Sequence, residues 1–384
     1  MNREESIKLL FRALQFSCKD KILMLQTQYW NQRRKGLLPK DATEEAYVLE
    51  HLGEVLAEES KDFHAEDRER RVSAVLPLFS RERCKELENK RYPSGYAQLD
   101  AAMNGGFTSG VHVLGAASSL GKSTFLLQMA AQMAAQGLNV IYVSLEMGRK
   151  DLVAKLVSMY TYIDTDGRNG KTMAELTCGC EESFADQDWN IVGKATDTIA
   201  AFSDKLTILD ERVHGMSMSD ISEYVFAYMR EYGTVPILMI DYLQILARSA
   251  GMERCTDKQV VDLNIAALRG LSAQYDMPVI VVSSLNRDSY AGAVDFSSCK
   301  ESGSIEYSCD TLLGLHLRGA EQKGFDAMSA RAAEPRQLTL SIIKQRYGAS
   351  GIKIDYNFRA RYNYFSEVEH HPRPRNATRN GFDV

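Results

Sequence analysis

One stretch restricts the possible folds of this chain more than any other, residues 111–124 with the sequence VHVLGAASSLGKST. Its pattern indicates an apolar strand, then a loop of small residues, then the start of a helix. Successive backbone N–H groups bind polyphosphates, and only small residues let the backbone wrap that closely around one. The stretch therefore predicts a phosphate-binding loop. Its binding residues would be Gly115, Ala116, Ala117, Ser118, Ser119, Leu120, Gly121, Lys122, Ser123 and Thr124.

Two residues at the end of this loop have specific chemical roles. The ammonium group of Lys122 would contact the β- and γ-phosphates, and the hydroxyl of Ser123 would bind Mg²⁺. Ala116 stands where the usual pattern has a glycine, so the loop alone could also be a small-residue turn before a lysine. The flanking sequence favours the phosphate loop, because a helical apolar pattern follows it, ends at Gly137 and leads to a second apolar run at 140–143.

The composition limits the classes of protein to which the chain can belong. At 384 residues it can form one large domain with a smaller appendage. The net charge of -5 excludes a globally basic nucleic-acid binder, but it is compatible with a ring that has a local basic lining. No run approaches the roughly 18 apolar residues of a membrane span, and the first residues resemble no secretory signal. We therefore expect a cytoplasmic protein without a membrane partner. The seven cysteines have no zinc-binding spacing and are expected to be reduced.

Three segments are predicted along the chain: 1–91, 92–365 and 366–384. The first is charge-rich, with amphipathic helical patterns over residues 7–16 and 47–56, and we interpret it as a helical region and linker without chemistry of its own. The composition changes at the sequence YPSG, residues 92–95, where the large domain begins. The last segment has little apolar surface to bury, and we expect a flexible tail.

Strand and helix patterns alternate throughout the large domain. Such alternation is typical of an α/β fold in which helices cover both faces of a mostly parallel sheet. The predicted strands are 111–114, 140–144, 206–209, 236–241, 278–283, 311–316 and 338–343, and the predicted helices lie near 123–136, 149–160, 218–231 and 257–275. Long connections remain at 162–200, 284–304 and 318–336, and loops of that length are usually functional.

Two acidic residues follow predicted strands of this sheet. Glu146 comes directly after the strand at 140–144, where its carboxylate could orient and deprotonate a water that attacks the γ-phosphate. An isolated glutamate is more often a surface residue, but its place after the strand next to the loop favours the catalytic role. Asp241 ends the apolar run 237–240 and would hold Mg²⁺ together with Ser123. Because an unpaired buried carboxylate is costly, a metal or a hydroxyl partner is expected beside it.

Polar residues after the strand at 278–283 supply further candidates. Ser284, Asn286 and Arg287 could sense the γ-phosphate, although capping of a turn explains Ser284 and Asn286 equally well. The run KESGSIE, residues 300–306, could contact a phosphate backbone through Lys300 and its small residues, but runs of this kind also occur in ordinary loops.

Two cations stand where the strand predicted at 338–343 ends. They are Lys344 and Arg346, in the run KQRYG. The sequence does not pair them with the nucleotide of their own chain. We interpret them as candidates for a cationic finger that reaches the γ-phosphate held by a neighbouring subunit.

Taken in order, these motifs resemble the motor domain of the DnaB-type replicative helicases. The resemblance covers about residues 92 to 365, and its specificity comes from the ordered series, since each motif is weak alone. The matching motifs are YPSG at 92–95 with GG at 105–106, the loop 115–124, SLEM at 144–147, DYLQ at 241–244, LNR at 285–287, KESGSIE at 300–306 and KQR at 344–346. The resemblance implies a RecA-like P-loop NTPase fold, in addition to the small helical N-terminal region.

The resemblance also implies an activity and partners. It implies a six-membered ring of identical chains that binds ATP and Mg²⁺ between subunits and travels 5′ to 3′ along single-stranded DNA, with a replication loader or initiator as a further expected partner. In such a ring Glu146 activates water, and Lys344 and Arg346 act on the neighbour's nucleotide. The DNA-facing loop would contain Lys300, Glu301 and Gly303.

Some positions depart from the family pattern. Ala117 and Ser118 stand where Arg-Pro is common, Ser284 replaces a glutamine that senses the γ-phosphate, and Lys300 replaces an arginine, which loses a bidentate phosphate contact. The N-terminal region shows no recognisable similarity to the family's, so primase recruitment is not carried over, and a mobile-element or prophage variant would fit. Our first hypothesis is an ATP-driven helicase or translocase. The alternative is a RecA-like ATPase that acts as a nucleotide-controlled assembly switch or loader without unwinding.

Overall fold

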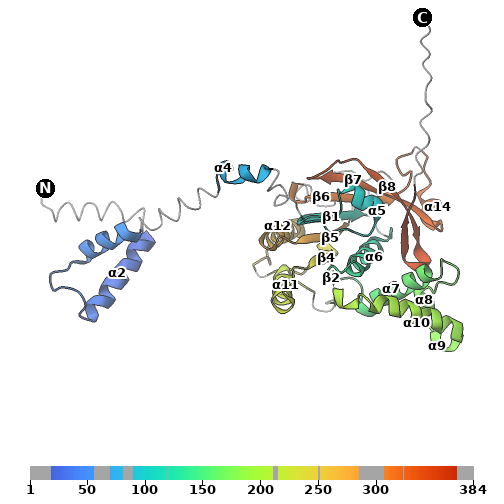
Figure 1. Cartoon of the computed structure of the whole chain (residues 1–384), viewed down its shortest axis with the longest axis horizontal. Coiled ribbons are helices and arrows are strands. Elements are labelled where there is room, and N and C mark those ends of the chain that lie inside the picture. Colours follow the sequence, from blue (N-terminus) through green and yellow to red (C-terminus); the bar gives the residue numbers. More distant parts are fainter. Residues whose placement is uncertain are drawn as a thin grey trace, which may run out of the picture. The chain divides into compact units, whose positions relative to one another are not determined.

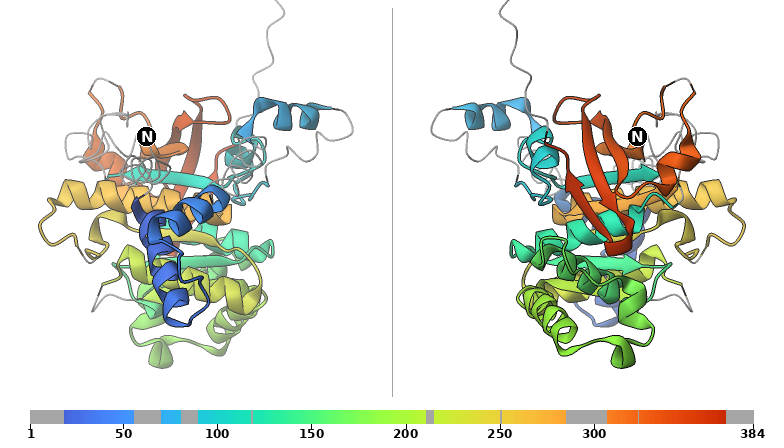
Figure 2. Two further views of the ribbon diagram at one scale, coloured as in Figure 1. Left: turned by 90° about the vertical axis from the view of Figure 1, so that its left-hand side faces the viewer. Right: turned by 90° about the vertical axis from the view of Figure 1, so that its right-hand side faces the viewer.

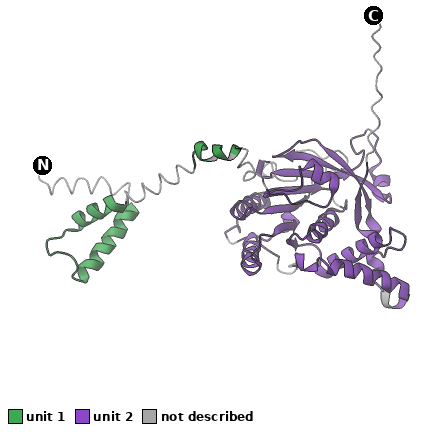
Figure 3. Cartoon of the chain, in the orientation of Figure 1, with its two compact units in different colours: residues 1–88 green, residues 89–384 purple. Residues whose placement is uncertain are grey.

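The structure is a computed structural model of the chain. It describes residues 19–55, 70–80, 90–117, 119–210, 215–249, 251–284, 307–322 and 324–369. Contacts divide the chain into two compact units, Met1–Glu88 and Asn89–Val384 (Figure 3). Among the described helices, none is long and apolar enough to span a membrane.

The smaller unit contains a pair of packed helices. They are α2 (Lys19–Arg34) and the helical residues 44–55. Their shared core consists of Ile22, Leu25, Tyr29, Tyr47, Val48 and Leu52. The helix predicted over 47–56 is therefore present as far as the described residues extend, whereas the helix predicted over 7–16 lies outside them. A short helical segment follows, α4 (Val72–Val75) with a 3₁₀ turn at Leu76–Phe79.

The larger unit is built on a nine-stranded sheet with the strand order β3-β2-β4-β5-β1-β6-β7-β8-β9 (Figure 1). Strands β1 to β6 run parallel, and β7, β8 and β9 continue the sheet in antiparallel fashion. The strands are β1 (Gly110–Ala116), β2 (Val140–Ser144), β3 (Leu206–Asp210), β4 (Ile237–Asp241), β5 (Pro278–Ser284), β6 (Thr311–Leu317), β7 (Arg336–Gln345), β8 (Lys353–Arg359) and β9 (Tyr364–Glu367). The orange and red strands β7 to β9 form one edge of the sheet (Figure 2).

Helices cover both faces of the parallel part of this sheet. One face carries α6 (Lys122–Ala135) and α7 (Arg149–Asp164), and the other carries α11 (Met218–Tyr232) and α12 (Asp257–Tyr275). The unit also contains α5 (Ala97–Ala102), α8 (Met173–Thr177), α9 (Cys180–Ser183), α10 (Asp186–Ala200), which packs on α7, and α14 (Ala327–Ala332). Side chains alternate along each strand: in β1, Val111 and Val113 pack in the core under α11 and α12, while Leu114 packs in the core under α6 and α7. Buried parallel strands therefore show the continuous apolar runs that the sequence displays.

The fold class predicted from the sequence is confirmed, with differences at one edge and in two connections. The seven predicted strands and four predicted helices are all present, with ends that differ by a few residues. Strands β8 and β9 are not among the predicted elements, and their antiparallel pairing makes the sheet mixed at that edge. The connection 162–200 contains α8, α9 and α10, and the connection 318–336 contains α14, so neither is an irregular loop throughout. The connection 284–304 lies outside the described residues beyond Ser284.

Candidate nucleotide site

The predicted phosphate loop joins β1 to α6 through two residues with positive φ. Ser119 has φ +63° and Gly121 has φ +89°, and α6 begins at Lys122. A Cβ atom on Gly121 would lie 2.8 Å from a ring carbon of Phe358 and 3.0 Å from one of Phe365. Glycine is therefore required here for its backbone conformation and for the close packing of two aromatic rings. Ser118 lies outside the described residues.

The end of this loop and three other segments surround one cavity of about 360 Å³. It is lined by Ser119, Gly121, Lys122, Ser123, Thr124, Glu146, Met147, Lys155 and Tyr242. The sequence placed Lys122, Ser123 and Glu146 in one site, and the structure brings them to the same cavity. The remaining loop residues Gly115, Ala116, Ala117 and Leu120 lead into or support this turn, and Ala116, Ala117 and Leu120 are buried.

Asp241 lies at the end of β4, next to the end of β2 in the parallel register, and is completely buried. The Tyr142 hydroxyl donates a hydrogen bond of 3.1 Å to its Oδ2 atom. Burial raises the pKa of the Asp241 carboxyl, and hydrogen bonds from Ser123 and Tyr142 lower it. Its Oδ1 atom has no hydrogen-bond partner among the described residues. A buried carboxylate oxygen without a partner, beside the Ser123 side chain, fits an Mg²⁺ ligand.

Glu146 lies beyond the end of β2, and the register places it at the same edge of the sheet as Asp241. The Leu145 N–H donates to the Asp241 carbonyl oxygen at 3.0 Å, which fixes the backbone just before Glu146. The Glu146 side chain is exposed to the cavity, in contrast to the buried Asp241. This difference suits a carboxylate that meets a water molecule rather than a metal.

Lys155 is a cavity residue that the sequence interpretation missed. It lies on α7, and its Nζ atom donates to the Thr124 Oγ1 atom at 3.2 Å. Burial lowers the pKa of this ammonium group, while the nearby Asp241 and Glu146 carboxylates act in the opposite direction. A signal for it exists in the sequence: Lys155 falls within the apolar stripe of α7, between Leu152 and Leu156.

The two finger candidates lie far from the loop of their own chain. The Arg346 Nη1 atom lies 2.6 Å from Asp310 Oδ1, and the Lys344 ammonium donates to the Cys309 carbonyl oxygen at 2.8 Å. Asp310 is anchored at the start of β1, because its Oδ2 atom accepts the Val111 N–H at 2.9 Å. The length of β1, roughly 20 Å, separates this position from the phosphate loop. A role of Arg346 at a neighbour's nucleotide remains a prediction.

Several other predicted site residues fall where the structure gives little or no description. Ser284 ends β5, and its backbone lies next to Ala116 in the parallel register, which is the strand edge expected for a sensor. Asn286, Arg287, Lys300, Glu301 and Gly303 lie outside the described residues, so their roles stay predictions.

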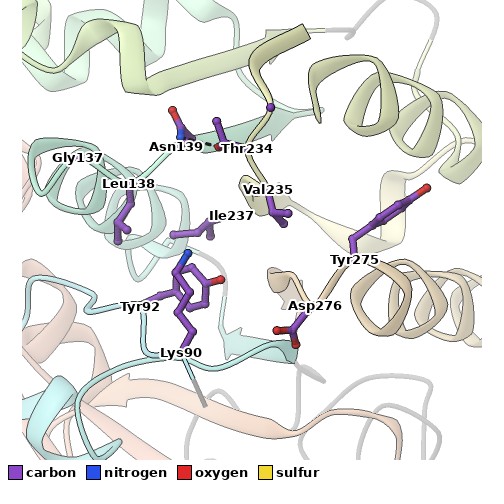
Figure 4. A pocket seen from close by; sticks show the side chains of 11 residues that line it. Lys90, Tyr92, Gly137, Leu138, Asn139, Thr234, Val235, Ile237, Tyr275 and Asp276 are labelled. Atoms are coloured by element: carbon purple, nitrogen blue, oxygen red, sulfur yellow. Dashed lines mark hydrogen bonds between the residues drawn. The ribbon is translucent and has the colours of Figure 1, made fainter. Parts of the chain in front are cut away.

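A larger cavity, of about 500 Å³, lies at the opposite edge of the sheet, before β2 and β4 (Figure 4). The Asn139 side chain donates to Thr234 Oγ1 at 2.8 Å on its wall, and the Lys90 ammonium lies 4.9 Å from the centre of the Tyr92 ring. Its lining combines apolar side chains, glycines and scattered polar groups. The phosphate loop, the Ser123 hydroxyl and Glu146, which phosphate chemistry requires, line the smaller cavity and not this one.

The chain is similar to known proteins in both sequence and fold. Residues 92–367 match the family model described as the DnaB-like helicase C terminal domain. The replicative DNA helicase DnaB of Leifsonia xyli subsp. xyli is 27% identical over 280 residues, and that of Geobacillus stearothermophilus is 27% identical over 283 residues. Each match covers 72% of this chain and 56% of the relative, so the chain spans about half the length of these relatives.

Solved structures show the same fold. A solved ATPase domain matches with a TM-score of 0.64 and 23% identity, over 77% of this chain and 98% of that one. A DnaB-like replicative helicase, studied with its interactions with primase, matches with a TM-score of 0.64 and 21% identity, over 94% of this chain and 87% of that one.

Proposed function

The chain belongs to the DnaB-like helicase family by its C-terminal domain, and from this premise we propose that it is an ATP-driven, ring-shaped DNA helicase or translocase that moves on single-stranded DNA during replication. The observation that carries the proposal is the cavity that brings Lys122, Ser123 and Glu146 together beside the buried Asp241. Each of the three hydrolytic tasks, phosphate binding, metal binding and water activation, then has a residue in position.

The proposed reaction is an in-line attack of water on the γ-phosphate of ATP. The loop from Gly115 to Thr124 binds the phosphates through backbone N–H groups, with the Lys122 ammonium at the β- and γ-phosphates. Ser123 and Asp241 are the residues that would hold Mg²⁺, which supplies positive charge to the phosphate oxygens when bound. Glu146 positions the water and accepts its proton as the bond to phosphorus forms and the bond to the ADP oxygen breaks.

We propose that the site is completed in a homo-hexamer. Within one chain, Lys344 and Arg346 lie at the opposite end of β1 from the phosphate loop, so they suit a neighbour's nucleotide better than their own. Closure around ATP would then require two chains. Ser284, Asn286 and Arg287 remain the candidates that would sense the γ-phosphate at the end of β5.

DNA contact is assigned by the family resemblance to Lys300, Glu301 and Gly303. In a ring these residues would face the central channel and follow the phosphate backbone of the threaded strand. A loader or initiator that places the ring on DNA is a further partner in this proposal.

The test is the rate of ATP hydrolysis with and without single-stranded DNA. We expect stimulation by DNA in the wild type, and loss of the stimulation in Lys300→Ala with basal turnover retained. The matched control is Lys205→Ala, which removes an exposed lysine just before β3. Hydrolysis that is indifferent to DNA, together with assembly that depends on nucleotide, would contradict a helicase and support the assembly switch.

A further inference from the structure

The antiparallel strands β7, β8 and β9 lie against the phosphate loop, a contact that the sequence motifs did not predict. Arg336 is the first residue of β7, and its Nη1 atom donates to the Ser119 carbonyl oxygen at 2.7 Å. The Nε atom of the same guanidinium donates to the Arg331 carbonyl oxygen at 2.8 Å, at the end of α14. The guanidinium is thus fixed by α14 while it binds the loop.

Aromatic rings from β8 and β9 extend this contact. Arg336 pairs with Phe358 in the antiparallel register, and its Cζ atom lies 5.7 Å from the centre of the Phe358 ring. The rings of Phe358 and Phe365 are stacked with centroids 4.1 Å apart, and both lie against Gly121. The antiparallel edge therefore lies against both loop residues with positive φ: β7 binds the Ser119 carbonyl, and the rings from β8 and β9 occupy the space that a Gly121 Cβ atom would need.

The contact at Ser119 has a consequence for anion binding. A residue other than glycine at φ +63° is strained and needs support from its surroundings. The C=O and N–H groups of a planar trans peptide point in opposite directions. With the Ser119 carbonyl bound to Arg336, the N–H of Leu120 points away from Arg336, and the cation increases the polarity of the peptide. A loop held in this way does not have to reorganise when an anion binds.

We propose that Arg336 is a positioning residue of the phosphate loop: it holds the Ser119 peptide in the conformation that binds the diphosphate part of the nucleotide. The inference rests on the proposed function, because it concerns the same site. It differs from the role of the finger cation, since Arg336 acts on the loop of its own chain and before hydrolysis. It therefore affects the affinity for ADP and ATP alike and leaves the chemical step nearly unchanged.

The test measures the affinity of the full chain for ADP, together with the KM and kcat of ATP hydrolysis. In Arg336→Ala we expect the Kd for ADP and the KM for ATP to rise about tenfold, with kcat within about twofold of the wild type. Arg336→Lys keeps one donor but not the second, so we expect an intermediate rise. The matched control is Arg318→Ala, which removes an arginine just after β6 whose guanidinium pairs with Asp355, at 3.2 Å, instead of with the loop.

The outcomes separate this inference from the proposed function. An ADP affinity of Arg336→Ala within twofold of the wild type would overturn the inference. So would a fall in kcat at unchanged ADP affinity, because that pattern belongs to a group that acts in the transition state. If Arg336→Ala does not fold, Arg336→Lys decides in the same way. A wild-type chain that binds neither ADP nor ATP would instead contradict the proposed function itself.

Discussion

The two ends of β1 carry opposite halves of the proposed site. At the carboxyl end, the phosphate loop and Glu146 line a cavity. The buried Asp241 lies at the same edge of the sheet, and one of its carboxylate oxygens has no partner among the described residues. At the amino end, Arg346 is already paired with a carboxylate, Asp310. The first end is prepared to receive a ligand, whereas the second holds a cation in a fixed position. This difference fits the proposal that the carboxyl end of β1 in one copy and the amino end of β1 in another copy form one shared site.

The position of Arg346 depends on β1 itself. Asp310 uses one oxygen for Arg346 and the other for the Val111 N–H, at 2.9 Å. A Cβ atom on Gly110 would lie 2.5 Å from that second oxygen, so Asp310 can approach the strand only because this residue is glycine. The phosphate loop and the proposed finger residue Arg346 of one chain are therefore attached to the two ends of one strand. In a ring, a movement of β1 at one subunit interface would therefore displace Arg346 at the next interface.

Removal of Arg346 from the amino end of β1 should have the largest effect on hydrolysis. We expect Arg346→Ala to lower kcat about 10⁴-fold with nucleotide affinity nearly unchanged, because the guanidinium would stabilise the transition state of a neighbour's nucleotide. The measurement is steady-state ATP hydrolysis beside nucleotide binding. Mixing Arg346→Ala with the binding-deficient Lys122→Ala should restore part of the activity, since some mixed interfaces contain an intact loop and an intact finger.

No recovery in verified mixed oligomers would contradict action between chains. Hydrolysis at the full rate by a monomeric preparation would do so as well. Either result would mean that the two ends of β1 do not cooperate across an interface.

Substitution of Glu146 tests the proposed chemistry at the carboxyl end of β1 without changing the amino end. Glu146→Gln keeps the size of the side chain but cannot accept a proton, so we expect kcat to fall about 10³-fold while ATP still binds. Glu231→Gln, at the exposed end of α11, is the matched control and should leave hydrolysis unchanged. A similar fall in both variants, or a loss of ATP binding in Glu146→Gln, would speak against water activation by this carboxylate.

Gly110 tests whether the finger is positioned by β1. In Gly110→Ala the new methyl group would displace the Asp310 carboxylate, and we expect kcat to fall on the order of tenfold without loss of nucleotide affinity. Gly137→Ala is the control, because Gly137 also has positive φ, +84°, but has nothing within 4 Å of the added atom. It should lower the stability by about 1–2 kcal/mol and leave kcat unchanged. Equal kcat values for Gly110→Ala and Gly137→Ala would show that Asp310 does not position Arg346 for hydrolysis.

The carboxyl end of β1 could be predicted from the sequence because its signals are local. The apolar runs of buried parallel strands are continuous, and the functional residues follow them directly, as Glu146 follows β2 and Asp241 ends β4. Since the carboxyl ends of parallel strands meet at one edge, the order of the motifs suffices to bring these residues together.

The amino end and the antiparallel edge could not be predicted in the same way. The pairing of Arg346 with Asp310 depends on the register of β6 and β7, which shifts between Leu312 and Leu313. No local pattern specifies such a shift. Strand β8 has the sequence KIDYNFR, in which buried Ile354, Tyr356 and Phe358 alternate with polar residues. This period of two is a usable signal, but it extends over only three apolar residues.

His112 gives the mildest test of the amino end, because it adjoins the Asp310 contact on β1. It is buried, its Nε2 atom lies 2.8 Å from the Thr108 carbonyl oxygen, and burial lowers its pKa from 6.5 to about 4. The unfolded chain therefore takes up a proton at a higher pH than the folded chain does. The contribution of His112 to the free energy of unfolding should be constant above pH 6.5 and fall as the pH drops from 6.5 to about 4, by up to about 3 kcal/mol in total. Urea unfolding of the wild type and His112→Gln at pH 7 and pH 5 measures this, and an equal loss of stability in both would contradict a neutral, buried His112.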